Sequence, residues 1–359
     1  MKRSFSDTLM DWLRQRLPVD AITEFAEHKR VPAYVGSIWY YFGGIALFLF
    51  IVQVTTGILL IMYYQPGVQT AYESVRFTVV HVKFGWLVRS IHTWSANLMI
   101  FAVFVHMFSV FFTKAYRKPR ELTWFTGLVL LALCMGFGFS GYLLPWNTLA
   151  FFATKVGTAI VATTPFVGKT VQEILRGGKD VGAETLTRFF GLHVAVMPAI
   201  FTMVLGAHLA LIQIQGMHEP HGWEHAPESK KRYMPFFPNF ILRDLLVWLI
   251  VLNVLAILAV MFPWEIGHKA DPSAAAPMGI KPEWYFLFMY QALKFFPGKI
   301  LMFDGDAVGV VLFAIGGLLW ATVPFWDVRL PAGSRNRIVT YTGVGVVLMI
   351  IVLTGIGLR

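Results

Sequence analysis

The sequence predicts an all-α membrane protein with seven transmembrane helices, a four-helix bundle followed by a three-helix domain. The 359 residues are 57% hydrophobic with a mean hydropathy of +0.62, which is typical of a polytopic membrane protein rather than a soluble domain. Seven apolar runs carry no charge, and each can hold the roughly 20 residues that a bilayer helix needs. Four histidines lie inside two of these runs. We expect the bundle in residues 1–215 and the three-helix domain in residues 216–359.

The seven runs follow each other at 38–64, 90–113, 122–154, 189–217, 245–264, 307–326 and 338–358. The third run is too long for one helix, so we expect the chain to leave the membrane after Pro145. The following loop, 147–187, is predicted to lie on one membrane face as short amphipathic helices. The first 35 residues are charged and amphipathic, without the apolar segment of a cleavable signal.

The charge pattern predicts the orientation. The net charge is +10, and the basic residues are in modest excess on the side that holds the N-terminus, which places that end in the cytoplasm. They are spread over short loops, so the sequence does not indicate nucleic-acid binding. Cys134 is the only cysteine, which excludes an internal disulfide, a CxxCH haem attachment and iron–sulfur ligation by this chain.

The four histidines form two pairs. His92 and His106 are 14 residues apart, close to four helical turns, so they share one helix face about 21 Å apart. His193 and His208 are 15 apart, and we expect a kink at Pro198 to absorb the extra residue. Two facing helices with such pairs would form two bis-histidine sites at different depths, a geometry that suits two haems. The alternative is that these histidines pack helices or relay protons singly.

Four glycines repeat the spacing of the histidines. Gly43 and Gly57 in the first run are 14 apart, as are Gly127 and Gly141 in the third. Glycine inside a helix costs about 1 kcal/mol relative to alanine, and here it would let a flat macrocycle approach the backbone. Ordinary small-residue helix packing is the alternative.

Two arginines precede the histidines at the non-cytoplasmic helix ends. Arg89 comes three residues before His92, and Arg188 comes five before His193. Both could bind haem propionates through charge-assisted hydrogen bonds. Alternatively, either could be an interface anchor.

These residues and three motifs, GYLLPW (141–146), ETLTRFFGLH (184–193) and KPEWYFLFMYQALKFFP (281–297), resemble the cytochrome b family of quinol–cytochrome c and plastoquinol–plastocyanin reductases. The 15-residue spacing resembles the b6 branch, and the chain from about 235 resembles subunit IV of that complex. The resemblance therefore implies a b6 half with four spans fused to a subunit IV half with three, without the eighth helix of mitochondrial forms.

The resemblance implies how the histidines pair. His92 and His193 would hold a low-potential b-type haem near the positive side, and His106 and His208 a high-potential one near the negative side. The second and fourth spans run in the same direction, which independently supports this pairing.

The same resemblance implies a quinol-oxidation site at the positive side. Glu283 lies in an apolar, aromatic segment where burial raises a carboxyl pKa, so it can accept a quinol proton; a first-turn helix acid beside Pro282 is the alternative. In the family this glutamate takes the proton, and Tyr285 and Tyr290 shape the pocket. One quinol electron would pass to a Rieske iron–sulfur partner and the other through the two haems to a second quinone, with two protons released.

A quinone-reduction site is implied at the negative side. Asp244 matches the family's quinone-contacting acid, and Gln213 stands where the family has His or Arg. The nearby His218, His221 and His225 could feed protons to the quinone, but a solvated loop is favoured. Because Pro220 and Gly222 argue against a helix there, a metal site is not expected.

Departures from the family pattern give further expectations. Tyr41 stands where the b6 branch attaches a third haem through cysteine, so no covalent third haem is expected. Ser109 replaces a propionate-binding arginine, and Lys114 or Arg117 could serve instead. Ala153 replaces a glycine of inhibitor-sensitive forms, which predicts weak inhibition by strobilurin-type compounds.

The sequence as a whole predicts the multi-pass core of a bc-type complex in a bacterial inner membrane. Its expected partners are a Rieske protein, a c-type cytochrome subunit, quinone and a second copy of the complex. The two alternatives are a di-haem anchor subunit of a dehydrogenase or hydrogenase and a transporter whose histidines relay protons. The quinone and the final acceptor stay open.

Overall fold

The computed structural model describes residues 4–20, 24, 28–33, 38–220, 223, 226–327 and 337–359. The regular secondary structure of the described residues is helical apart from two small two-stranded sheets. Six helical segments are long and apolar enough to cross a membrane: Ile38–Ile61, Gly85–Phe112, Glu121–Leu143, Ala183–Gln215, Phe236–Met261 and Arg337–Leu358. The all-α membrane class is therefore confirmed.

The run 307–326, the sixth of the seven expected spans, differs from the prediction. It forms α13 (Gly305–Ala321), a break at Thr322, and the short α14 (Val323–Trp326). At about 1.5 Å per residue, the 17 residues of α13 are shorter than the roughly 30 Å of a hydrocarbon core. The break has a local cause, because Pro324 lacks the N–H that would continue the helix.

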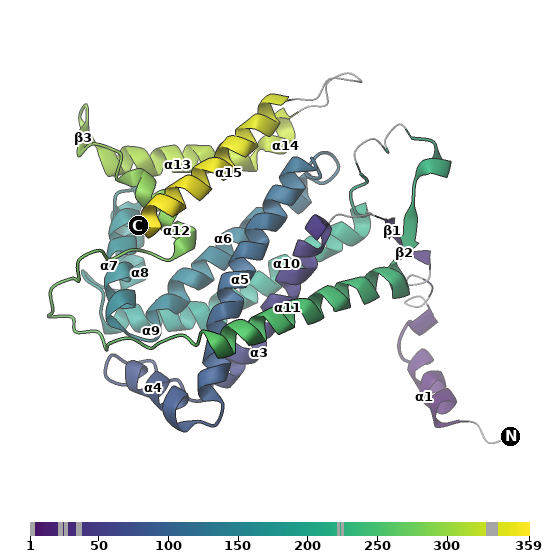
Figure 1. The fold of residues 1–359 in the computed structure, drawn as a ribbon, viewed down its shortest axis with the longest axis horizontal. Helices are drawn as coiled ribbons and strands as arrows, with labels where there is room; N and C mark the ends of the chain where they lie inside the picture. The colour runs from purple at the N-terminus through teal and green to yellow at the C-terminus, as the bar shows by residue number, and fades with distance from the viewer. Residues whose placement is uncertain are drawn as a thin grey trace.

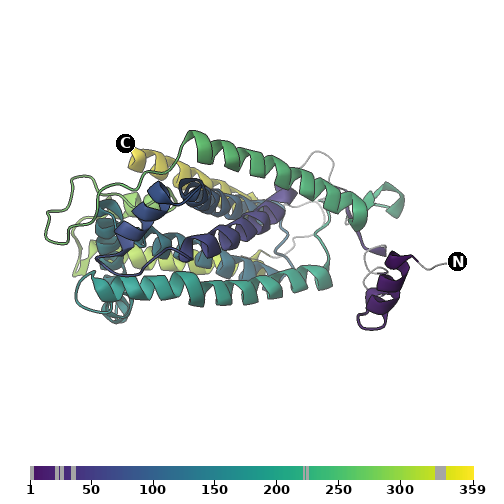
Figure 2. The ribbon, with the colours of Figure 1, turned by 90° about the horizontal axis from the view of Figure 1, so that it is seen from below.

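The long helices lie side by side and run between two ends of the molecule (Figures 1 and 2). α3 (Phe42–Ile61) packs against α5 (Gly85–Phe112), and α6 (Glu121–Leu143) against α10 (Met197–Gln215). α11 (Ile241–Met261) covers α3 and α5, while α12 (Trp284–Leu293) packs on α15 (Arg337–Leu358). Their shared core includes Leu49, Ile100, Cys134 and Leu255, one from each of α3, α5, α6 and α11.

Short elements occupy the two ends of the bundle. One end carries α4 (Ala71–His81), α7 (Thr148–Ala162), α8 (Gly168–Arg176) and α9 (Ala183–Gly191). The other end carries α1 (Phe5–Arg14), which stands apart from the body, and the antiparallel pair of β1 (Arg30–Pro32) with β2 (Tyr233–Pro235). The remaining short elements are η1 (Ile38–Tyr41), η4 (Glu228–Lys230), η5 (Phe236–Phe240), β3 (Lys299–Ile300) and β4 (Phe303–Asp304).

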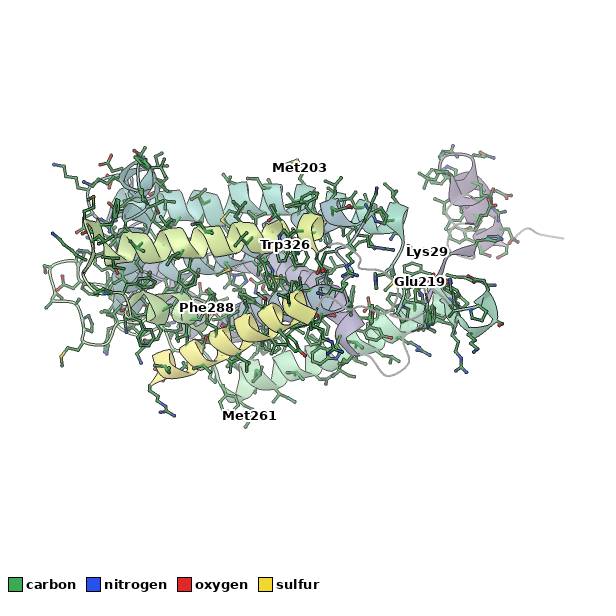
Figure 3. All side chains as sticks on the ribbon, turned by 90° about the horizontal axis from the view of Figure 1, so that it is seen from above. Lys29, Met203, Glu219, Met261, Phe288 and Trp326 are labelled. Atoms are coloured by element: carbon green, nitrogen blue, oxygen red, sulfur yellow. The ribbon has the colours of Figure 1, made fainter. Side chains whose placement is uncertain are left out.

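The outer surface of the bundle is apolar. Met203 on α10 and Met261 on α11 lie at opposite outer edges in Figure 3 and are 69% and 67% exposed. Such side chains around a helical bundle are suited to contact lipid.

The third apolar run breaks where the sequence predicted. α6 ends at Leu143, and α7 begins at Thr148. Between them Trp146 is buried at 1% exposure with a left-handed φ of 51°. Asn147 then caps α7, because its side chain accepts a hydrogen bond from the N–H of Ala150 at 2.9 Å.

A buried ionic cluster joins the two halves of the chain. Asp327, after α14, is 1% exposed and contacts Lys114 at 3.6 Å and Arg117 at 3.0 Å in the loop between α5 and α6. The Tyr116 hydroxyl donates a hydrogen bond to the same carboxylate oxygen at 2.5 Å. Lys114 and Arg117, expected near a haem propionate, are therefore directed to Asp327.

Candidate haem and quinol sites

A π-helical turn brings His193 into register with His208. The turn, η2 (Leu192–Val196), joins α9 to α10, and the N–H of Met197 bonds to the carbonyl of Leu192, five residues earlier. A π turn takes up one extra residue, which reconciles the 15-residue spacing with the 14 of the other pair. The predicted kink at Pro198 is thus replaced by a wide turn just before it, since Pro198 has no N–H to donate.

The imidazoles of His92 and His193 face each other across the bundle. Their ring centroids are 6.4 Å apart and their planes are inclined by 70°. A metal–imidazole bond is about 2 Å long and the ring centre lies about 1 Å farther, so two rings that bind one metal ion from opposite sides have centroids roughly 6 Å apart. The observed separation fits a bis-histidine metal centre.

The four glycines lie against the four histidine rings. A Cβ built on Gly141 would come 2.5 Å from Cε1 of His193, and one on Gly43 3.1 Å from Cε1 of His106. The corresponding distances are 3.3 Å from Gly127 to His208 and 3.5 Å from Gly57 to His92. The glycines therefore make room for the ligand rings themselves, in addition to any flat macrocycle.

Hydroxyl groups contact the Nδ1 atoms of three of these rings. Thr56 Oγ1 lies 2.8 Å from Nδ1 of His92, Ser140 Oγ lies 3.1 Å from that of His193, and Thr126 Oγ1 lies 2.9 Å from that of His208. With Nδ1 engaged, Nε2 is the nitrogen that remains for a metal.

The two predicted propionate ligands have other partners. Arg89 donates to the carbonyls of Trp264 at 2.7 Å and Glu265 at 3.2 Å. Arg188 is exposed and donates to the carbonyl of Ile174. A role of either guanidinium toward propionate stays a prediction.

Glu283, the residue predicted to accept a quinol proton, is the N-cap residue of α12. Its backbone carbonyl accepts from the N–H of Phe286 at 2.9 Å, but its carboxylate makes no capping hydrogen bond to the described backbone of α12. Burial raises the pKa of this carboxyl. The carboxylate is therefore available for proton transfer rather than used as a helix cap.

The aromatic residues after Glu283 are held by the first half of the chain. Trp284 Nε1 donates to Oδ1 of Asn97 on α5 at 2.7 Å. Tyr285 is 5% exposed, and its hydroxyl lies against Gly138 on α6, where a Cβ would come within 2.3 Å of it. Tyr290 lies farther along α12 and donates to the carbonyl of Ile280 at 3.5 Å.

The segment 262–270, which we call the strap, leads from α11 toward Glu283. Donors of the first half bind its carbonyl groups in succession: Trp94 to Phe262 (2.8 Å), Arg89 to Trp264 and Glu265, Asn147 to Ile266 (2.8 Å), Tyr72 to Gly267 (2.8 Å), and Thr148 to His268 and Lys269. Lys269 also forms an ion pair with Glu73 at 3.1 Å. The strap is therefore fixed over the end of the bundle that holds α4 and α7.

The predicted quinone-reduction residues lie toward the opposite end. Asp244 on α11 contacts α3, because a Cβ on Gly44 would come 2.5 Å from its Oδ1. Gln213 accepts a hydrogen bond from Lys29 Nζ, and Figure 3 shows Lys29 near the end that carries α1. Asp244 and Gln213 thus occupy the same general region on different helices.

The structure also describes Ser109, Tyr41 and His218, for which the sequence led to expectations. Ser109 lies 3.5 Å from the carbonyl of Trp39, and Tyr41 stacks on Phe240 with ring centroids 6.1 Å apart. His221 and His225 lie outside the described residues, whereas His218 lies within them. Within the described ranges, no three His, Cys, Asp or Glu side chains are placed to hold one metal ion.

Sequence reasoning missed Thr56, Thr126, Ser140 and Asn97. A signal for the first three was present, since each directly precedes one of the four spaced glycines. Asn97 gave no such signal, because its partner Trp284 is 187 residues away.

The paired histidines, their glycines and the half-buried Glu283 define a polytopic membrane protein with two ligand layers suited to tetrapyrroles. Comparison with known proteins agrees: residues 27–216 match the family described as Cytochrome b/b6/petB, and residues 269–359 match Cytochrome b(C-terminal)/b6/petD. The chain belongs to the cytochrome b family, with a b6-type N-terminal part and a petD-like C-terminal part in one polypeptide.

Individual relatives show how far the similarity extends. The chain is 49% identical over 354 residues to a "Cytochrome bc complex cytochrome b subunit" of Chlorobaculum thiosulfatiphilum, covering 98% of this chain and 81% of that one. It is 42% identical over 212 residues to a "Cytochrome b6" of Porphyra purpurea, covering 59% of this chain and 98% of that one. A solved "Hyperthermophilic respiratory Complex III" chain aligns with a TM-score of 0.85 at 30% identity, covering 97% of this chain and 91% of that one. The family implies b-type haems, which the histidine pairs and glycines fit.

Proposed function

We propose that the chain is the cytochrome b subunit of a bc-type quinol oxidoreductase in a bacterial inner membrane. The observation that carries this is the facing pair His92 and His193 at 6.4 Å, together with a second pair, His106 and His208, about four helical turns farther along the same helices. The relatives named cytochrome b subunit and Complex III support the same assembly. We further propose seven spans, with α13 as the shortest, and a cytoplasmic N-terminus.

In this proposal the four histidines hold two b-type haems through Nε2, with His92 and His193 at the low-potential layer. Bound there, haem supplies one-electron transfer between the two faces of the membrane. Glu283 accepts a proton from quinol at its carboxylate while Tyr285 and Tyr290 shape the pocket. At the other end, Asp244 and Gln213 contact the quinone that is reduced.

The complex would need partners for the remaining steps. A Rieske iron–sulfur protein would take one quinol electron, and a c-type cytochrome subunit would receive it. The complex is proposed as a homodimer that couples these reactions to proton translocation, without a covalent third haem at Tyr41 and without a role in nucleic-acid binding.

The test is redox titration of the purified intact complex together with a quinol–cytochrome c reductase assay. Two b-type components with distinct midpoints and reductase activity are expected. His208→Leu should remove the high-potential component and leave the low-potential one. Haem without quinol oxidation would favour a di-haem anchor subunit, and a preparation without haem would favour a transporter; either result overturns the proposal.

A further inference from the structure

Hydroxyl side chains are distributed unequally between the two histidine layers. Thr56 precedes Gly57 and contacts His92; Ser140 precedes Gly141 and contacts His193. The first layer therefore has a hydroxyl at both rings.

The second layer has only one position of this kind. Thr126 precedes Gly127 and contacts His208 at 2.9 Å. Opposite His106, the residue before Gly43 is Phe42, which has no hydroxyl.

The direction of these hydrogen bonds follows from the helix backbone. Thr56 Oγ1 donates its single proton to the carbonyl of Val52 at 2.7 Å, and Ser140 Oγ donates to that of Gly136 at 2.9 Å. Thr126 Oγ1 likewise faces the carbonyl of Leu122 at 3.0 Å. Each oxygen is then left as an acceptor, so the imidazole Nδ1–H is the donor.

A histidine that donates from Nδ1 is a stronger ligand at Nε2. The hydrogen bond fixes the tautomer and raises the basicity of the coordinating nitrogen, and a more basic ligand would favour the oxidised, more positively charged metal. Thr56 and Ser140 are 7% and 3% exposed, and a hydrogen bond shielded from water is electrostatically stronger. Hydrogen bonding of this kind is one means by which a protein tunes haem potential.

We propose that Thr56, Ser140 and Thr126 are positioning residues that tune the two haems unequally: two hydroxyls lower the midpoint of the His92/His193 layer, and one acts on the His106/His208 layer. This inference rests on the proposed function, because it requires both layers to bind haem. It assigns part of the potential difference between the layers to these hydroxyls.

The test is redox titration of each b-type component in Thr56→Val, Ser140→Ala and Thr126→Val complexes. Thr56→Val and Ser140→Ala are each expected to raise only the low-potential midpoint, and Thr126→Val only the high-potential one. A tenfold change in the equilibrium constant corresponds to about 59 mV for one electron, and we expect shifts up to that size. Thr56→Ser, which restores the acceptor oxygen, should return the midpoint toward that of the unmodified complex.

Thr55→Val is the matched control. Thr55 makes the same bond to its own helix, to Ile51 at 2.8 Å, but is exposed, so both midpoints should stay unchanged. If a threonine variant loses haem, the midpoint of the Ser140→Ala complex provides the test, because serine and alanine differ by only one non-hydrogen atom. Unchanged midpoints, or equal shifts of both components, overturn this inference. The two haem components of the unmodified complex would in that case still support the proposed function. A failure of the proposed function would appear earlier, as missing components in the unmodified complex.

Discussion

The indole of Trp284 donates a hydrogen bond to Oδ1 of Asn97 at 2.7 Å, which ties the residue after Glu283 to the helix that carries His92 and His106. The amide nitrogen of Asn97 in turn donates to the carbonyl of Thr93 at 2.9 Å. Both polar ends of the Asn97 side chain are therefore engaged, and its orientation is fixed. The segment that follows Glu283 is thus tied to α5, the helix that contributes His92 to the first histidine layer.

Asn97→Leu should slow quinol oxidation without changing the haem midpoints. A buried hydrogen bond contributes about 0.5–1.5 kcal/mol, so we expect a decrease in kcat of up to roughly tenfold. Trp284→Phe should have the same effect, and the double variant should lower kcat no further than either single change. Additive losses in this cycle would show that the two side chains act independently.

Glu283→Gln should remove the acid limb of the pH profile for quinol oxidation. Because burial raises the pKa of Glu283, less of it is carboxylate at a given acidic pH than for an exposed glutamate. Only the carboxylate accepts a proton, so the rate should rise as pH increases through this raised pKa. The variant should lose about 10²–10⁴-fold in rate, and a profile that keeps the limb would exclude Glu283 as its origin.

Gly141→Ala and Gly57→Ala should differ in haem content. A Cβ on Gly141 would come 2.5 Å from the His193 ring, closer than atoms pack, whereas one on Gly57 would sit at 3.5 Å from His92, an ordinary contact. Pyridine haemochrome assays are expected to show a lower total haem content for Gly141→Ala and an unchanged content for Gly57→Ala. Equal losses in both variants would argue that the macrocycle, rather than the histidine ring, sets the space requirement.

Asp327→Asn should destabilise the complex. The change leaves Lys114 and Arg117 without their buried counter-charge, and breaking a buried pair in this way costs about 3–5 kcal/mol. Burial also lowers the pKa of Lys114, so part of this cost is relieved when the lysine loses its proton. Thermal denaturation should show a lower Tm, whereas Asp306→Asn, at an exposed position of α13, should leave it unchanged; equal Tm values for the two variants would contradict the role assigned to the cluster.

Asn147→Asp should loosen the strap while the cap of α7 is kept. The carboxylate can still accept from the Ala150 N–H, but it cannot donate to the carbonyl of Ile266. Tryptic cleavage after Lys269 should therefore be several-fold faster, with little change in Tm. Asn147→Ala loses both bonds and should also cost about 0.5–2 kcal/mol of stability from the cap. Resistance of both variants to trypsin would show that the other anchors suffice.

Much of the fold could be predicted from the sequence, because long apolar runs have few other stable forms in a bilayer. The two places where the structure departs from the predicted helices both lie at prolines. Pro324 ends α13 early, and Pro198 produces a wide π turn where a kink was expected. In both cases the missing N–H was visible in the sequence, but the way in which the backbone would compensate was not.

The candidate site was predictable to the extent that it depends on side-chain type and helical spacing. His92, His106 and the spaced glycines follow directly from the 3.6-residue turn. The strap could not be predicted, since its anchors bind backbone carbonyls that every residue carries. Asn97 became meaningful only once the neighbouring helices were in place, because its partner Trp284 is far away in the sequence.

Three non-covalent connections between the early and late parts of the chain have a consequence for how such a protein can be encoded. The β1–β2 pair, the strap and the Asp327 cluster join the two parts at different levels of the molecule. The two parts are therefore held together by these contacts as well as by the peptide between α10 and β2. A gene fission at this point would yield two polypeptides that still assemble, and a later fusion would preserve the same architecture.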